Sequence, residues 1–146
     1  MKKTLQLLVI VILGACLGAG GLVTGAFASS ANLYVASSGN DGNACTTTAP
    51  CATINHAISV AGPHSRISVG PGTYAEMVTI TTPITLIGQN ATIDATGLDE
   101  GIYIHGAGAA GASVSGFTVA NATFEGILVE QTSNITIQDN VVQNND

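Results

Sequence analysis

Short apolar runs recur along residues 78–143, and segments rich in glycine, asparagine and aspartate separate them. The run at 78–80 (VTI) is followed 24 residues later by the run at 102–104 (IYI), and a further 25 residues later by the run at 127–129 (ILV). Successive side chains of a β-strand point to opposite faces, so the outer two residues of each run face a core and the middle one faces outward. The pattern therefore predicts three equivalent strands, one in each repeat.

Two further strands are predicted in every repeat, because other apolar positions recur with a similar spacing. The second strand contains Leu86, Val114 and Ile137 in turn, and the third contains Ile93, Val119 and Val142. The runs are too short for helices and lack a 3.6-residue apolar stripe, and the spacing of a leucine-rich repeat is absent. Three strands in a unit of 23 to 28 residues predict an all-β fold, a parallel β-helix of about three coils.

The segment before these coils is predicted to cap the stack. Residues 33–35 (LYV) and 67–69 (ISV) are expected to form its first strands. Between them, residues 52–61 form an amphipathic helix with an apolar face made of Ile54, Ala57, Ile58 and Ala61. A solenoid needs such a cover because the unpaired strand edges at its end promote aggregation.

Residues 1–28 have the pattern of a signal peptide, which predicts that the protein is exported. Lys2 and Lys3 form a positive region, residues 5–24 are apolar and uncharged, and the Ala-Phe-Ala sequence at 26–28 is typical of a cleavage site. Two alternatives stay open: a lipid anchor at Cys16, where the preceding residues resemble a lipobox, and an uncleaved anchor, because the apolar run approaches membrane-spanning length. All three interpretations place residues 29–146 outside the cytoplasm, secreted or at the cell surface. The protein would then contact the membrane only through residues 1–28.

Cys45 and Cys51 are the only cysteines after the predicted signal, and they bracket the short loop CTTTAPC. An oxidising compartment favours a disulfide between two such residues. Without a histidine nearby at ligand spacing, the pair makes a poor zinc site. We therefore predict a structural disulfide.

The charge balance excludes several classes of protein. The chain has nine Asp or Glu against three Lys or Arg, and after Lys2 and Lys3 the only Lys or Arg is Arg66. Nothing remains to neutralise phosphates, which excludes nucleic acid as a partner. A content of only 8% charged residues also argues against a coiled coil or a helical bundle.

Several segments together resemble a known family. They are LYVASSGNDGN (33–43), APCATINHAISVA (49–61), RISVGPGTYAEMVTI (66–80), ITLIGQNATIDA (84–95) and SNITIQDNVVQNND (133–146). This succession resembles the N-terminal cap and first coils of secreted right-handed parallel β-helix proteins of the pectin-lyase-like superfamily. The resemblance covers residues 33–146 and implies a single-stranded right-handed β-helix over residues 29–146. It is specific for the fold and carries little information on activity.

Members of that superfamily include pectate and pectin lyases, polygalacturonases, alginate epimerases and surface proteins with no shown activity. Most have more coils, so the chain is expected to be truncated. We expect an exported module, non-catalytic on its own, that binds polysaccharide or serves as a cell-surface scaffold. The alternative is an N-terminal fragment of a polysaccharide lyase, glycoside hydrolase or uronan epimerase whose catalytic residues lie beyond the C-terminus. No catalytic residue is assigned, because no catalytic motif of the family is matched and Arg66 lies in the capping segment.

The repeat spacing places two rows of side chains on the outer face of the first strands. The rows are Thr79, Tyr103 and Leu128, and next to them Thr81, His105 and Glu130. Sugar binding requires aromatic and polar groups on such a face, which makes Tyr103, His105 and Glu130 the candidate ligand-binding residues. His105 and Glu130 are expected on adjacent coils, close enough for an ion pair.

Acidic residues recur just before each of these strands, at Glu76, Glu100 and Glu125. Carboxylates stacked at strand spacing repel one another by about 1 kcal/mol per pair even in water. Ca²⁺, which prefers carboxylate ligands, would relieve this repulsion, and Asp99 offers one more ligand. Separately, Asn121, Asn140 and Asn144 predict a structural asparagine ladder along one turn.

Overall fold

The computed structural model describes residues 29–146, so the predicted signal peptide and the alternative lipid anchor at Cys16 lie outside the described residues. The described elements, in chain order, are β1 (Asn32–Val35), α1 (Ile54–Val60), β2 (Arg66–Val69), β3 (Gly72–Tyr74), β4 (Val78–Ile80), β5 (Thr85–Asp94), β6 (Ile102–His105), the short 3₁₀ helix η1 (Ala107–Ala109), β7 (Ser113–Ala120), β8 (Ile127–Glu130), β9 (Thr136–Gln138) and β10 (Val141–Gln143).

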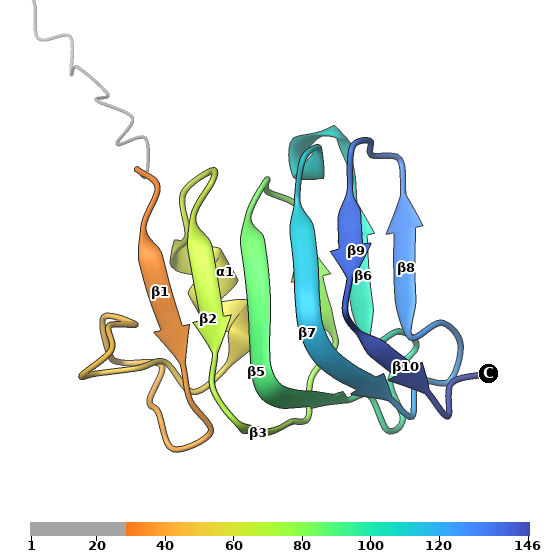
Figure 1. Ribbon diagram of the computed structural model, residues 1–146, viewed down its shortest axis with the longest axis horizontal. Coiled ribbons are helices and arrows are strands. Elements are labelled where there is room, and N and C mark those ends of the chain that lie inside the picture. The colour runs from red at the N-terminus through yellow and green to blue at the C-terminus, as the bar shows by residue number, and fades with distance from the viewer. Residues whose placement is uncertain (1–28) are drawn as a thin grey trace, which may run out of the picture.

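The strands form two parallel sheets that stack coil upon coil (Figure 1). The smaller sheet has the order β4-β6-β8. The larger has the order β1-β2-β5-β7-β10, with β3 also paired to β5 and β9 also paired to β7. Every strand pair is parallel and joins strands from successive coils, which confirms the parallel β-helix.

The predicted repeat positions lie opposite one another in the sheets. Residues 78–80, 102–104 and 127–129 are paired in register across β4, β6 and β8. In the larger sheet, Leu86 pairs with Val114 and Val114 with Ile137, while Ile93 pairs with Val119 and Val119 with Val142. The spacing of apolar residues in the sequence therefore identified the strand register of all three coils.

Strands β5 and β7 are long because each turns a corner and supplies two sides of its coil (Figure 1). At the corner the register shifts between Ile87 and Ala91. Gly116 has a φ of +79° there, and a Cβ on it would collide with the carbonyl oxygen of Gly88 in the coil before it. Glycine at 116 thus allows the two corners to approach closely, since it alone adopts this conformation without steric cost.

The core runs along the inside of the coils. It contains Ile67, Leu86, Val114, Ile93, Val119, Ile104 and Phe117, each with at most 1% of its surface exposed. Burying a side chain of this size contributes about 1.5–3 kcal/mol. The inward positions predicted for the first two coils are thus confirmed as core.

Helix α1 takes the place of a strand ahead of β4. It spans Ile54–Val60, shorter than the predicted 52–61, because Thr53 is the N-cap and Ala61 the C-cap. The Asn55 side chain extends the ladder beyond β4: its Oδ1 accepts a hydrogen bond from Thr79 N at 3.0 Å, and its Nδ2 donates to Met77 O at 2.7 Å. The helix therefore covers the N-terminal edge of the smaller sheet.

The larger sheet begins with β1, and the loop from Cys45 to Cys51 covers its outer edge. Tyr34 N donates to Cys45 O at 2.8 Å, and Ala36 N donates to Cys51 O at 2.9 Å. Val35 and Cys51 form an isolated parallel bridge. The predicted cap is therefore confirmed, with a helix on one sheet and a disulfide loop on the other.

Asparagines connect neighbouring coils, although in a different arrangement from the predicted ladder. Asn121 donates to the carboxylate of Asp94 at 2.9 Å. Asn140 accepts from Phe117 N at 2.9 Å and donates to Val114 O, and Asn145 accepts from Ala122 N at 2.9 Å. The amides thus bond mainly to the backbone of the preceding coil, because each turn leaves backbone groups without a strand partner.

No helix within residues 29–146 has the length and apolar character needed to cross a membrane.

Candidate ligand-binding face

The outer face of the β4-β6-β8 sheet brings the predicted aromatic pair together. Tyr103 and His105 are two residues apart on β6 and alternate with the buried Ile102 and Ile104, so both side chains point outward. Their rings stack with centroids 4.3 Å apart and an interplanar angle of 16°. The pair forms a partly exposed aromatic surface on a rigid strand.

Glu130 joins this pair from β8. It is in register with His105, as predicted, but its carboxylate accepts a hydrogen bond from the Tyr103 hydroxyl at 2.8 Å. The expected ion pair with His105 is therefore replaced by a bond to Tyr103, because the stacked rings place the phenol beside Glu130. This hydrogen bond raises the pKa of Tyr103, since the neutral phenol is the donor.

The neighbouring positions complete the face. Thr79 on β4 and Leu128 on β8 lie on either side of Tyr103 in the strand register, as the repeat predicted. Thr81 lies one residue beyond the end of β4 and is exposed. The three candidate ligand-binding residues thus form one cluster, and ligand binding by it stays a prediction.

The predicted row of carboxylates has a different arrangement. Glu76 turns toward the start of α1, where its two oxygens accept hydrogen bonds from Ile54 N at 2.8 Å and Asn55 N at 3.0 Å. The first amides of a helix have no partner within the helix, and a carboxylate satisfies them. Glu76 is therefore part of the cap.

Asp99, Glu100 and Glu125 lie in the turns that precede β6 and β8. Backbone hydrogen bonds connect these turns, from Gly101 N to Glu125 O at 3.1 Å and from Phe124 N to Asp99 O at 2.9 Å. Within residues 29–146, the predicted acidic residues do not form a group of three whose oxygens converge on one point. Calcium binding stays a prediction. Glu76 is not available as a ligand, because both of its carboxylate oxygens accept hydrogen bonds from α1.

The disulfide between Cys45 and Cys51 is confirmed, with a Cα–Cα distance of 4.7 Å. Both residues are buried. The structure also places His56 beside them, so the expectation that no histidine lies near the pair was wrong. The spacing of six residues between the cysteines and five more to the histidine is visible in the sequence, but only the turn into α1 shows that the imidazole faces the sulfur atoms.

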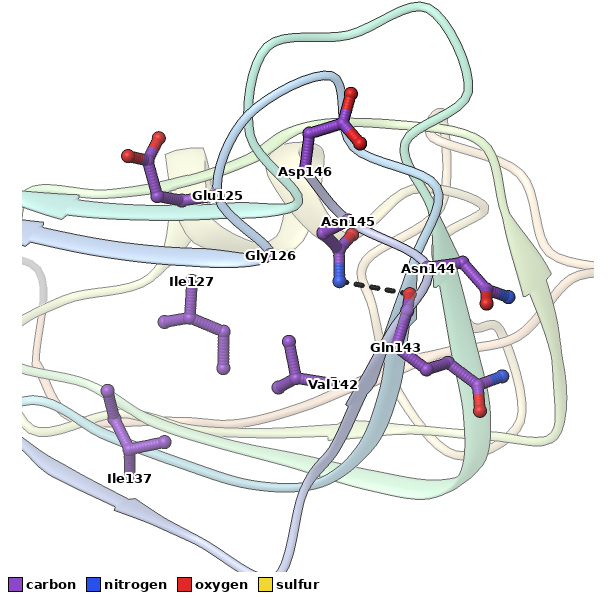
Figure 2. Close-up of a pocket in the computed structure, with 9 residues that line it drawn as sticks. All are labelled: Glu125, Gly126, Ile127, Ile137, Val142, Gln143, Asn144, Asn145 and Asp146. Atoms are coloured by element: carbon purple, nitrogen blue, oxygen red, sulfur yellow. Dashed lines mark hydrogen bonds between the residues drawn. The ribbon is translucent and has the colours of Figure 1, made fainter.

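A hollow of about 520 Å³ opens at the end of the stack beyond the last coil. Inward-facing apolar side chains form its floor, and Glu125 and Asp146 lie at its rim. Figure 2 shows all the residues that line it. The floor consists of Ile127, Ile137 and Val142. The hollow is thus the uncovered end of the hydrophobic core.

The stacked parallel coils, the helical cap and the single covering loop define a parallel β-helix protein. Residues 37–113 match a family model described as a protein of unknown function, DUF1565, which is associated with β-helix proteins. The match spans more than half of the chain, and the chain belongs to this family. Comparison with curated proteins and with solved structures gives no match.

The matched span runs from the loop after β1 to the start of β7. It contains Asp41, whose carboxylate accepts hydrogen bonds from Ala52 N, Thr53 N and the Thr53 hydroxyl at 2.8–2.9 Å. It also contains Tyr103 and His105, whereas Glu130 lies beyond it. The acidic residues Asp41 and Glu76 in the recognised segments therefore hold the cap in place.

Proposed function

We propose that this protein is an exported β-helix module of the pectin-lyase-like type that binds polysaccharide on the outer face of β4, β6 and β8. The observation that carries the proposal is the cluster of Tyr103, His105 and Glu130. Stacked rings offer an apolar surface to the C–H face of a sugar. The Glu130 carboxylate can accept hydrogen bonds from sugar hydroxyls beside it.

The shape of the sheet supports an extended ligand. Solenoids bind along their faces because equivalent positions repeat from coil to coil at the strand spacing of about 4.8 Å. The β4-β6-β8 face spans three coils, with Thr79 and Leu128 on either side of Tyr103. The disulfide is compatible with an extracellular location.

The charge of the chain favours neutral sugars. The net charge is −6, and Arg66 is the only Lys or Arg within residues 29–146. A uronate polymer would be repelled by Glu130 in the absence of a cation. We therefore expect neutral polysaccharides to bind more tightly than uronate polymers.

The test is a glycan array followed by titration calorimetry with the oligosaccharide that binds best. Tyr103→Ala is expected to weaken binding about tenfold, the equivalent of about 1.4 kcal/mol. The matched control is Tyr34→Ala, which removes a partly buried tyrosine from β1 in the other sheet. The absence of any bound glycan, or equal effects of the two substitutions, would contradict the proposal.

A second candidate is the cap and first coils of a carbohydrate-active enzyme whose catalytic residues lie beyond Asp146. It is favoured by the apolar floor of the hollow, because a further coil would pack against Ile137 and Val142. Reading the coding sequence downstream for further coils with acidic clusters distinguishes the two candidates. Uronate-lyase absorbance with and without Ca²⁺ tests for activity in the chain itself.

A further inference from the structure

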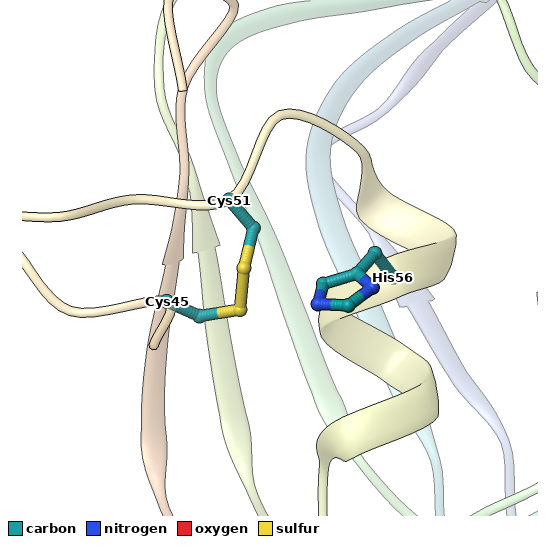
Figure 3. A group of neighbouring side chains, drawn as sticks. All are labelled: Cys45, Cys51 and His56. Carbon is teal, nitrogen blue, oxygen red and sulfur yellow. A yellow bond between two sulfur atoms is a disulfide. The ribbon is translucent and has the colours of Figure 1, made fainter. Parts of the chain in front are cut away.

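The disulfide loop contains a group of side chains that the polysaccharide-binding proposal does not use. The sulfur atoms of Cys45 and Cys51 and a ring nitrogen of His56 all lie within 4.8 Å of one another. Figure 3 shows the imidazole facing the disulfide from the first turn of α1. Among residues 29–146, these three side chains are the only group of three or more Cys, His, Asp or Glu whose ligand atoms converge in this way.

The backbone holds both cysteines in place independently of the bond between their sulfur atoms. Tyr34 N donates to Cys45 O at 2.8 Å, and Cys51 N donates to Tyr34 O at 3.0 Å. Ala36 N donates to Cys51 O at 2.9 Å. These hydrogen bonds join both cysteines to β1 through backbone atoms, so they do not require the disulfide.

His56 is fixed by a separate set of contacts. Its backbone N donates to the Thr53 hydroxyl at 3.2 Å, which is the N-cap bond of α1. The Asp41 carboxylate holds Thr53 in turn through the Thr53 amide at 2.9 Å and the hydroxyl at 2.8 Å. These contacts hold the backbone of His56, and none of them depends on the bond between the two sulfur atoms.

We propose that Cys45, Cys51 and His56 form a redox-gated zinc site. A dithiol reductant transfers two electrons and two protons to the disulfide, which becomes two thiols while the reductant becomes a disulfide. Zn²⁺ then displaces one proton from each thiol, so that two thiolates and the neutral imidazole bind the metal. Two protons are released, and water occupies the fourth position.

The chemistry of the three groups selects this metal. Thiolate and imidazole are the preferred ligands of Zn²⁺, at about 2.3 Å for sulfur and about 2.0–2.1 Å for nitrogen. Ca²⁺ and Mg²⁺ prefer oxygen and are excluded by the same ligands. The disulfide and the zinc ion are alternative ways to close one loop, and each holds the cover over the edge of β1.

The experiment uses protein purified from cells that express the full chain. It is reduced with a phosphine, which does not supply a competing thiol, and titrated anaerobically with Co²⁺ as a spectroscopic substitute for Zn²⁺. We expect one Co²⁺ per chain, with thiolate-to-cobalt charge transfer and the visible bands of tetrahedral cobalt, and displacement of the cobalt by Zn²⁺. The oxidised protein is expected to give neither signal.

Variants separate the site from adventitious binding. His56→Ala is expected to weaken Co²⁺ binding about 100-fold or more, because loss of a group that only hydrogen-bonds to a metal ligand already costs about 10- to 100-fold. His64→Ala, at an exposed histidine outside the site, is expected to leave binding unchanged. Far-ultraviolet circular dichroism is recorded at each step. Equal binding by His56→Ala and wild type, absence of the charge-transfer band, two chains per metal, or binding that accompanies loss of the β-sheet signal would each overturn the proposal.

Discussion

The two ends of the stack have the same strand pattern but different surroundings. At the N-terminal end, α1 covers the edge of the smaller sheet through Asn55, and the disulfide loop covers β1. At the other end, no element within residues 29–146 covers β8, β9 and β10. Inward-facing side chains that would be core in an earlier coil are therefore exposed there: Val129 at 40%, Ile137 at 43% and Val142 at 50%.

This difference shows how strongly a residue's contribution to the free energy of unfolding depends on the coil that follows it. In a solenoid, each repeat contacts only its neighbours, so stability is close to a sum of repeat and interface terms. Val119 and Val142 are adjacent in one inward row, yet Val119 has 0% of its surface exposed. The same residue type thus contributes fully in one coil and only in part in the next.

The largest expected effect comes from this pair of valines. Val119→Ala removes two buried methyl groups and should lower the free energy of unfolding by about 2–3 kcal/mol. Val142→Ala should lower it by about 0.5 kcal/mol, because half of that side chain already contacts solvent. Urea denaturation of the two variants and the wild type measures both values.

The control for this comparison is the dependence of unfolding on urea. An unchanged slope indicates that the same surface is exposed on unfolding in each protein, so that the midpoints report stability. Equal losses of stability for the two variants would show that the last coil is covered in solution, and analytical ultracentrifugation would then show whether a second copy covers it.

A smaller effect is expected at the covered end. Replacing both cysteines, as in Cys45→Ala with Cys51→Ala, should lower the free energy of unfolding by about 2 kcal/mol, because a loop this short gives only a small entropy gain in the unfolded chain. Amide hydrogen exchange should increase at Tyr34 and Ala36, whose N–H groups bond to the loop. Faster exchange in β10 and unchanged exchange in β1 would contradict the role of the loop as an edge cover.

The sequence predicted the strands better than the contacts at their ends. The period of apolar residues identified the in-register neighbours of residues 78–80 and of Leu86 and Ile93, because in a solenoid equivalent positions stack directly. It could not show that Glu76 binds the first amides of α1. That contact joins residues from different elements. The regular spacing of glutamates in the sequence does not tell whether a carboxylate contacts another carboxylate, a metal ion or a helix N-terminus.

The candidate site was predicted in part. Outward alternation placed Tyr103 and His105 on one face, and the repeat placed Glu130 beside them. The sequence could not predict which residue Glu130 bonds to, because this depends on side-chain rotamers. The stacking of Tyr103 on His105 directs the phenol hydroxyl toward the Glu130 carboxylate. His56 was missed since the turn from Cys51 into α1, rather than the spacing alone, directs the imidazole toward the disulfide.

The smallest expected effect concerns the pH dependence of the covered end. Desolvation by burial raises the pKa of Asp41, but the hydrogen bonds from Thr53 and Ala52 together with the charge of His56 outweigh it and hold the pKa below the ordinary value of 3.8. The folded protein therefore binds fewer protons at Asp41 than the unfolded chain does. The stability that Asp41 contributes is complete above its ordinary pKa and is lost as the pH falls through the lowered pKa.

Asp41→Asn tests this contribution, since asparagine keeps one acceptor oxygen and removes the charge. At neutral pH the variant should be less stable than the wild type by about 1 kcal/mol or less, a small value because Asp41 is only partly buried and solvent screens its charge. The difference should shrink as the pH falls below 3.8, which thermal unfolding at several pH values measures for both proteins. Asp94 also has a lowered pKa but is present in both chains, so its effect cancels in the difference. A difference that stays constant down to the lowest pH would show that the hydrogen-bond geometry of Asp41, rather than its charge, holds the cap to the first coil.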